Sequence, residues 1–454
     1  MQINEFLESV CKQIKYKPIR KSIAKELENH IEESKENYMH EGFEEKEAEE
    51  KAIIQMGNSE EIGKGLNKVH RPKLDWQLII IAIIMMCFGF LIAFTKTANL
   101  TTEDLQTNYM QKHLIFLMVG LLLGVMIYFI DYKKILKFSN IVYIFASAII
   151  LYDMMFGTTV NGITYIVIGT IFISASVVAV PLYIISFVGF MNEEIKENKI
   201  TKILTKKNIN VKTLKMLILG IISLFLLTLI PSIASAFILG LVYLILATTK
   251  IIVENKDTKK KLVKLWGIVV AISLLVLIYI FGFEPYISYK FQVAFNPQLD
   301  PDASGWLGVN RMIIINSANA IGEAEDMSNA LYLFDEGSNY ALISLLAHYG
   351  WIVSAVTVLT VILLSIKLIM DSVKIKEKYG KFIVIGISSL FILQSLFNLL
   401  MNFNMWLELD FNIPFISYGG VNLVVNMMCL ALILAVYRMK DINEFLCDGE
   451  YIKE

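Results

Sequence analysis

The sequence predicts an all-α, polytopic membrane protein with about ten transmembrane helices and a small helical domain before them. Two observations support this fold class. Hydrophobic residues make up 56% of the 454-residue chain and charged residues only 18%, whereas soluble domains carry about 25% charge. The charges also gather in short basic segments that separate long uncharged runs. The net charge of -1 gives no reason to expect a nucleic-acid partner, and the cysteines show neither disulfide nor metal-binding spacing.

Residues 1–72 are predicted to form a small cytoplasmic domain of helices. They are too strongly charged for a secretory signal peptide. Apolar residues recur at helical spacing in two stretches, Phe6, Val10 and Ile14, followed by Ile23, Leu27 and Ile31. Pro18 suits the first turn of the second helix. Gly57 can end a helix over 44–56, and Asn58 can cap the next one. We expect this domain either to aid folding or to bind an unknown cytoplasmic partner.

Residues 73–454 are predicted to form the membrane domain. A span needs roughly 20 apolar residues, and six runs suit one crossing each: 77–94, 114–130, 265–283, 338–366, 382–400 and 417–437. Two other runs, 139–192 and 216–249, are too long for one helix. Each lies between lysine-rich segments that stay in the cytoplasm under the positive-inside rule, so each must cross the membrane an even number of times.

The charge pattern also predicts which side of the membrane each connection faces. Outer turns are expected near Asn161-Gly162 and near Pro231-Ser232. The long polar segment at about 284–337 holds only Lys290 and Arg311 as basic residues and is acidic near its end. We therefore expect a large extracytoplasmic loop there, with both termini cytoplasmic, in the plasma membrane of a bacterial cell.

Several motifs fall at recognisable places in this topology. They are FNP at 295–297, GW at 305–306, YGW at 349–351 and PFISYGG at 414–420. The span before the last motif carries Gln394, Asn398 and Asn402. Together these features resemble the SEDS family, whose members FtsW, RodA and SpoVE act in cell division, cell elongation and sporulation.

The resemblance implies a function in peptidoglycan synthesis. Members of the family polymerise glycan strands from lipid II, an undecaprenyl-linked precursor, and usually work with a class B penicillin-binding protein. No cofactor is expected, although a divalent cation stays open. Irregular backbone at membrane depth is tolerated where it lines a wet cavity, so substrate contacts are expected at Asn398, Ser417, Tyr418, Gly419 and Gly420, with Lys290 and Arg311 as phosphate anchors. The alternative for the glycines is that they only allow close helix packing.

The catalytic position departs from the family pattern. In the family an aspartate just after the outer loop is the expected proton acceptor, whereas the triplet here reads Ser338-Asn339-Tyr340. An amide cannot accept that proton, and a positioned base contributes about 10²- to 10⁴-fold. Asp335 or Glu336, a few residues earlier, would have to replace it.

Two functions follow from these observations. The first is a divergent peptidoglycan glycosyltransferase, which the topology and PFISYGG favour. The second is a non-catalytic relative that binds the lipid-linked precursor or regulates the wall-synthesis complex. Asn339 favours the second function, as does the absence of the family's arginines after Asn161-Gly162. A precursor flippase ranks last, because the sequence lacks the membrane-buried charges that such proteins tend to need.

Overall fold

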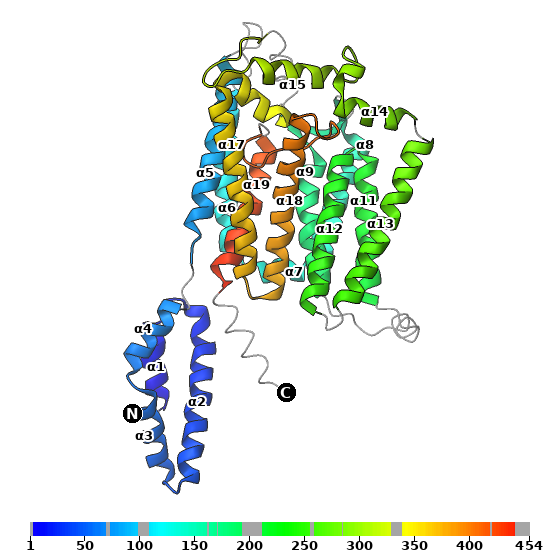
Figure 1. Ribbon diagram of the computed structural model, residues 1–454. Coiled ribbons are helices and arrows are strands. Elements are labelled where there is room, and N and C mark those ends of the chain that lie inside the picture. Colours follow the sequence, from blue (N-terminus) through cyan, green and yellow to red (C-terminus); the bar gives the residue numbers. More distant parts are fainter. Residues whose placement is uncertain are drawn as a thin grey trace. The chain divides into compact units, whose positions relative to one another are not determined.

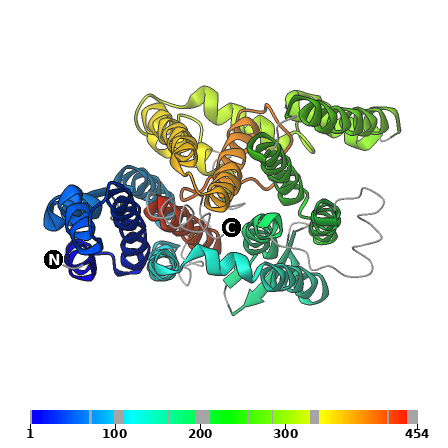
Figure 2. The ribbon, with the colours of Figure 1, turned by 90° about the horizontal axis from the view of Figure 1, so that it is seen from below.

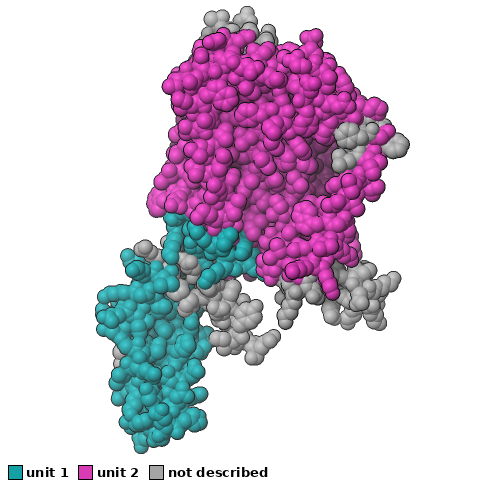
Figure 3. Space-filling view, in the orientation of Figure 1, with its two compact units in different colours: residues 1–75, 373–381, 436–454 teal, residues 76–372, 382–435 magenta. Residues whose placement is uncertain are grey.

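The computed structural model describes residues 3–69, 73–98, 109–160, 163–169, 171–192, 211–254, 258–283, 285–327, 338–417 and 420–440. The chain divides into two compact units, which are coloured separately in Figure 3. The first comprises Met1–Asp75, Val373–Lys381 and Val436–Glu454, and the second comprises Trp76–Ser372 and Phe382–Ala435. The N-terminal part of the first unit and the helix bundle of the second are described separately below.

The N-terminal residues form a helical bundle. Its helices are α1 (Ile3–Gln13), α2 (Arg20–His40), α3 (Glu45–Met56) and α4 (Ser59–Val69), with the short 3-10 helix η1 (Lys17–Ile19) before α2. The predicted apolar positions form its core: Phe6, Val10, Ile14, Ile23 and Ile31 are buried, and Leu27 packs against them.

The predicted helix ends are also confirmed. Gly57 ends α3 with a positive φ of 90°, a conformation that glycine adopts without a steric penalty. The Asn58 side chain accepts a hydrogen bond from the backbone N of Glu60, at 2.8 Å, and thereby caps α4.

Each predicted span corresponds to a helix over the residues that the structure describes (Figures 1 and 2). Eight helices of the described chain are long and apolar enough to cross a membrane: α5 (Trp76–Ala98), α6 (Tyr109–Phe129), α8 (Ser139–Phe156), α11 (Val211–Leu229), α12 (Ile233–Glu254), α17 (Ala341–Lys374), α18 (Lys378–Asn402) and α19 (Gly420–Arg438). The other two predicted spans are α9 (Ala175–Asn192) and α13 (Thr258–Phe283). The protein is therefore an all-α, multi-pass membrane protein.

The predicted turn at Pro231-Ser232 is confirmed, because it separates α11 from α12. The basic segment after α6 forms the short helix α7 (Tyr132–Lys137), and Asp131 caps it by accepting from the backbone N of Lys133 at 3.0 Å.

A small antiparallel sheet between α8 and α9 was not foreseen. Its strands β1 (Thr158–Val160), β2 (Ile163–Ile168) and β3 (Ile171–Ile173) pair in sequence order. Val160 lies opposite Ile163, so β1 and β2 flank the predicted turn at 161–162, which itself lies outside the described residues. Residues 158–173 are rich in valine, isoleucine and threonine, which favour strands, but a short apolar run does not by itself distinguish strand from helix.

The long loop after α13 contains helices at the end of the bundle where α17 begins (Figure 1). They are α14 (Pro285–Phe295), the 3-10 helix η2 (Pro297–Leu299) and α15 (Trp306–Ser317). The FNP and GW motifs meet here. A Cβ on Gly305 would lie 2.2 Å from the carbonyl O of Pro297, and one on Gly308 would lie 2.6 Å from Pro297 Cγ. The two glycines thus let α15 pack directly against η2.

Candidate functional site

The end of α18 holds two neighbouring backbone segments in place. Asn398 and Asn402 are fully buried, and both donate from Nδ2 to the carbonyl O of Asn339, at 2.8 and 3.1 Å. Asn339 belongs to the short 3-10 helix η3 (Ser338–Tyr340) at the start of α17. Asn398 also donates to the carbonyl O of Phe411, in the connection from α18 to α19. Asn398, predicted to contact substrate, therefore positions the backbone of both segments.

An acidic residue that sequence reasoning missed lies against Asn339. The side chains of Asn339 and Asn412 both hydrogen-bond to the Asp410 carboxylate. Burial raises the pKa of Asp410, and these two hydrogen bonds oppose the rise. The Oδ1 atoms of both asparagines are buried and have no hydrogen-bond partner among the described residues. The one sequence signal was an aspartate only four residues before Pro414, in a connection that leads directly into PFISYGG.

Tyr165 of β2 belongs to the same neighbourhood. Its pKa is raised by burial first, and then by the negative charges of Asp410 and Asp153. Asp153, near the end of α8, is fully buried and accepts a hydrogen bond from Thr164 Oγ1 at 3.0 Å. The small sheet thus lies within electrostatic range of the connection between α18 and α19.

Arg311 is a buried cation held by groups from two other segments. Its side chain on α15 is 2% exposed and forms an ion pair with Glu408, whose Oε1 lies 2.7 Å from Nη1. Asn404 Oδ1 accepts from Nε at 3.1 Å and from Nη2 at 2.6 Å. The guanidinium carbon also lies 5.3 Å from the ring centroid of Tyr340, the neighbour of Asn339. Arg311 therefore joins α15 to η3 and to the connection after α18.

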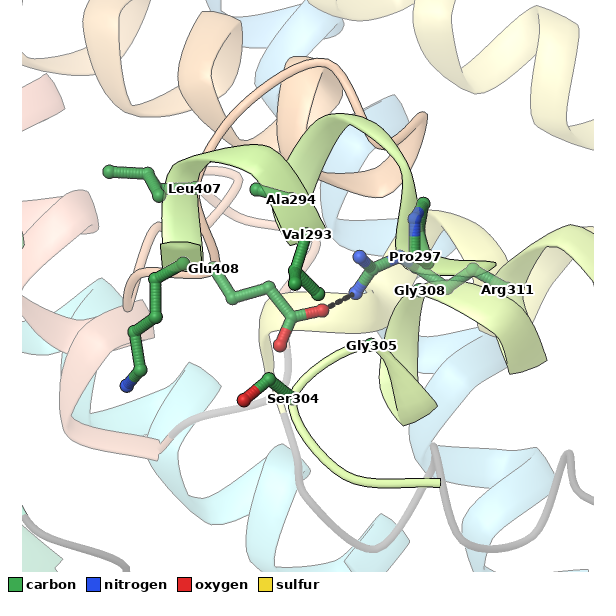
Figure 4. Close-up of a pocket in the computed structure, with 10 residues that line it drawn as sticks. Val293, Ala294, Pro297, Ser304, Gly305, Gly308, Arg311, Leu407 and Glu408 are labelled. Atoms are coloured by element: carbon green, nitrogen blue, oxygen red, sulfur yellow. Dashed lines mark ion pairs between the residues drawn. The ribbon is translucent and has the colours of Figure 1, made fainter. Parts of the chain in front are cut away.

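The two predicted phosphate anchors line one cavity of about 200 Å³. Figure 4 shows Arg311 and Glu408 pointing toward one another across it, with Val293, Pro297 and Gly308 in its wall. Lys290 of α14 completes the lining and is exposed. Since Glu408 balances Arg311, these three charged side chains leave one net positive charge at the cavity, and Lys290 is its accessible carrier.

PFISYGG packs closely against the first two spans. Ser417 Oγ accepts a hydrogen bond from the backbone N of Ile413 at 2.8 Å, which closes the turn before α19. A Cβ on Gly420 would lie 2.1 Å from Phe116 Cδ2 on α6, and one on Gly89 of α5 would lie 2.7 Å from the carbonyl O of Phe415. These contacts favour the close-packing explanation for Gly420.

Gly420→Ala is expected to lower the thermal stability of the protein in detergent. The Phe116 ring is rigid and must move as a whole to admit the methyl group, and such overpacking typically costs about 1–3 kcal/mol. Unfolding temperatures of Gly420→Ala and of the double variant Phe116→Ala/Gly420→Ala test this contact. The double variant should lose less stability than the sum of the two single changes, whereas strictly additive losses would contradict the contact.

The remaining predicted site residues, Asp335, Glu336, Tyr418 and Gly419, lie outside the described residues. Within the described part of the chain no group of three or more histidine, cysteine, aspartate or glutamate side chains could hold a metal ion. Four of the predicted site residues that are described fall into two neighbouring groups, Lys290 with Arg311 and Asn339 with Asn398, which Tyr340 connects.

Known proteins resemble parts of this chain that range from about a third to four fifths of its length. A protein from Thioalkalivibrio sp. named "Probable peptidoglycan glycosyltransferase FtsW" is 29% identical over 35% of this chain, and the match spans about two fifths (41%) of that relative. A protein of the same name from Idiomarina loihiensis is 22% identical over 81% of this chain and 88% of its own length.

The fold is also found in solved structures. A structure described as "Structural coordination of polymerization and crosslinking by a peptidoglycan synthase complex" contains a chain that matches 81% of this protein and 98% of its own length, with a TM-score of 0.61 and 17% identity. The family model described as "Cell cycle protein" matches residues 75–442, which include the eight candidate membrane spans of the described chain and both groups of site residues. This chain is therefore a member of the FtsW/RodA/SpoVE family of cell cycle proteins.

Proposed function

We propose that this protein is a peptidoglycan glycosyltransferase that polymerises lipid II. The observation that carries the proposal is the convergence of the family motifs on one region. FNP and GW build the wall of the cationic cavity, and the connection into PFISYGG supplies Glu408 to that cavity and Asp410 to Asn339. Relatives that match most of this chain carry the name of this activity.

The charges of the cavity suit a lipid-linked sugar pyrophosphate. Polymerisation transfers a sugar from its pyrophosphate carrier to a hydroxyl group, so negative charge on the leaving pyrophosphate must be stabilised. Cations placed where charge develops stabilise such a transition state. Lys290 can approach the pyrophosphate directly. Arg311, held in place by Glu408 and Asn404, contributes a positive electrostatic potential and forms part of the cavity wall.

The proposal includes an orientation and a partner. The lysine-rich segments between spans favour the cytoplasm, which would place both termini and the N-terminal helices there and the cavity outside. Lipid II presents its sugars on that outer side. A class B penicillin-binding protein is the partner that would crosslink the strands, in keeping with the synthase complex whose chain shares this fold. The N-terminal helices would meet a cytoplasmic partner.

Polymerisation of labelled lipid II by the purified full-length protein in detergent tests the activity. We expect glycan polymer from the unmodified protein under conditions in which a family member of known activity works. The non-catalytic alternative, which the amide at Asn339 favours, gives no polymer but still binds lipid II. Asn339→Asp measures how far the site depends on that position. If the unmodified protein makes no polymer and Asn339→Asp synthesises it efficiently, the non-catalytic alternative is established instead.

Lys290→Ala is expected to reduce polymerisation by about tenfold, mainly through a higher KM for lipid II. The effect is smaller than for a buried donor because the exposed ammonium group is screened by water and salt. Lys290→Arg keeps the charge and should retain most of the rate. Lys259→Ala removes an exposed lysine near the start of α13 and serves as the matched control. Equal rates for Lys290→Ala and the control would remove Lys290 from the substrate site.

A further inference from the structure

We propose that Asp410 is the proton acceptor for the sugar hydroxyl that attacks in polymerisation. The inference rests on the proposed function. It goes beyond it by naming the carboxylate that accepts the proton, because Asn339 stands where the family pattern has an aspartate. Asp410 is the carboxylate that the described part of the chain places against Asn339. It reaches that position from the connection before PFISYGG, between α18 and α19.

The hydrogen bonds around Asp410 leave it able to accept a proton. An ionised carboxylate offers about four lone-pair sites and donates nothing. Two of these sites receive the amide groups of Asn339 and Asn412, so two remain for a substrate hydroxyl. Asp410 also keeps part of its surface exposed. The carboxylate is thus oriented by two side-chain amides and keeps lone pairs for a substrate hydroxyl.

The surroundings of Asp410 also make its carboxylate a stronger base. Burial raises the pKa of the carboxyl group, and a base is most effective when its pKa approaches the working pH. The amide at position 339 has a role in this arrangement. An aspartate there would bring a second negative charge against Asp410, whereas the Asn339 amide donates to it and holds it in place.

The reaction balances with Asp410 as the base. The acceptor hydroxyl gives its proton to the Asp410 carboxylate while its oxygen forms a bond to the anomeric carbon of the donor sugar. The bond from that carbon to the pyrophosphate oxygen breaks, and undecaprenyl pyrophosphate leaves with the electron pair. Asp410 then releases the proton to water.

Polymerisation rates of single variants of the full-length protein test the proposal. Asp410→Asn should reduce the rate by about 100-fold or more, the contribution typical of a positioned base. Asp302→Asn makes the same chemical change at an exposed aspartate of the outer loop and should leave the rate within about twofold. The double variant Asp335→Asn/Glu336→Gln should also stay within about twofold of the unmodified protein.

Each alternative result has its own meaning. If the unmodified protein polymerises lipid II and folded Asp410→Asn is equally active, Asp410 is not the base and the proposed function stands. If Asp335→Asn/Glu336→Gln loses about 100-fold, the base lies in the outer loop, and this holds even if Asp410→Asn fails to fold. If the unmodified protein makes no polymer while Asn339→Asp does, Asp410 cannot substitute for the missing aspartate. If neither makes polymer, the proposed function fails together with the inference.

Discussion

Arg311→Leu is expected to destabilise the protein by about 3 kcal/mol, because breaking a buried ion pair leaves a charge without compensation. Glu408 would lose its partner at 2.7 Å, and Asn404 would lose two hydrogen bonds. The expected loss of stability is at the lower end of the range for breaking a buried ion pair, since Glu408 is 29% exposed and can be hydrated. Thermal unfolding in detergent measures the change, and polymerisation should fall with it because the cavity loses its wall.

The double variant Arg311→Leu/Glu408→Leu separates the loss of stability from the loss of polymerisation. Replacing both members of a buried pair by apolar residues is often close to neutral, so the double variant should recover much of the stability but not the activity. Arg311→Lys should recover little, because an ammonium group cannot reproduce the forked contact with Asn404 or the contact with the Tyr340 ring. A double variant as unstable as the single one would show that the Glu408 contact contributes nothing.

The helices of this protein were predictable because each one carries a local signal. Uncharged runs of sufficient length and the even-crossing rule located the helices of the membrane domain, and Gly57 and Asn58 marked real helix ends. The sheet at 158–173 was missed because apolar residues at a membrane surface look alike in strand and helix. Local signals of this kind identify elements but do not reveal which of them lie side by side.

The candidate site was only partly predictable for the same reason. Lys290 and Arg311 were identified as the cations of the outer loop, and they do share a cavity. The pairing of Arg311 with Glu408 spans 97 positions of the sequence (408 minus 311), and the contact of Asn339 with Asp410 spans 71 (410 minus 339). No periodicity or spacing encodes contacts at such separations. Asp410 was passed over because the motif that follows it drew attention to Ser417 and Gly420.

Gly350→Ala is expected to be among the most damaging changes that a single methyl group can make in this protein. Gly350 interrupts α17 with φ 84° and ψ -176°, a region of backbone conformation that is essentially restricted to glycine and costs other residues about 1–3 kcal/mol. Its Cβ would also lie 2.6 Å from the carbonyl O of Asn319. Neither the conformation nor the contact can relax without moving the main chain.

The consequences should reach the candidate site through the backbone. Trp351 N and Ile352 N, just after the break, donate to the carbonyl groups of Asn319 and Ala320 at 3.0 and 3.1 Å. These bonds tie the segment after α15 to α17, whose buried first turns follow directly from Asn339 and Tyr340. Gly350→Ala should therefore lower both the unfolding temperature and the polymerisation rate. Gly267→Ala, in α13 with open space around the site, should lower neither, since alanine favours a helix over glycine by about 1 kcal/mol. Equal behaviour of the two variants would mean that the break at Gly350 does not hold the segment after α15 in position.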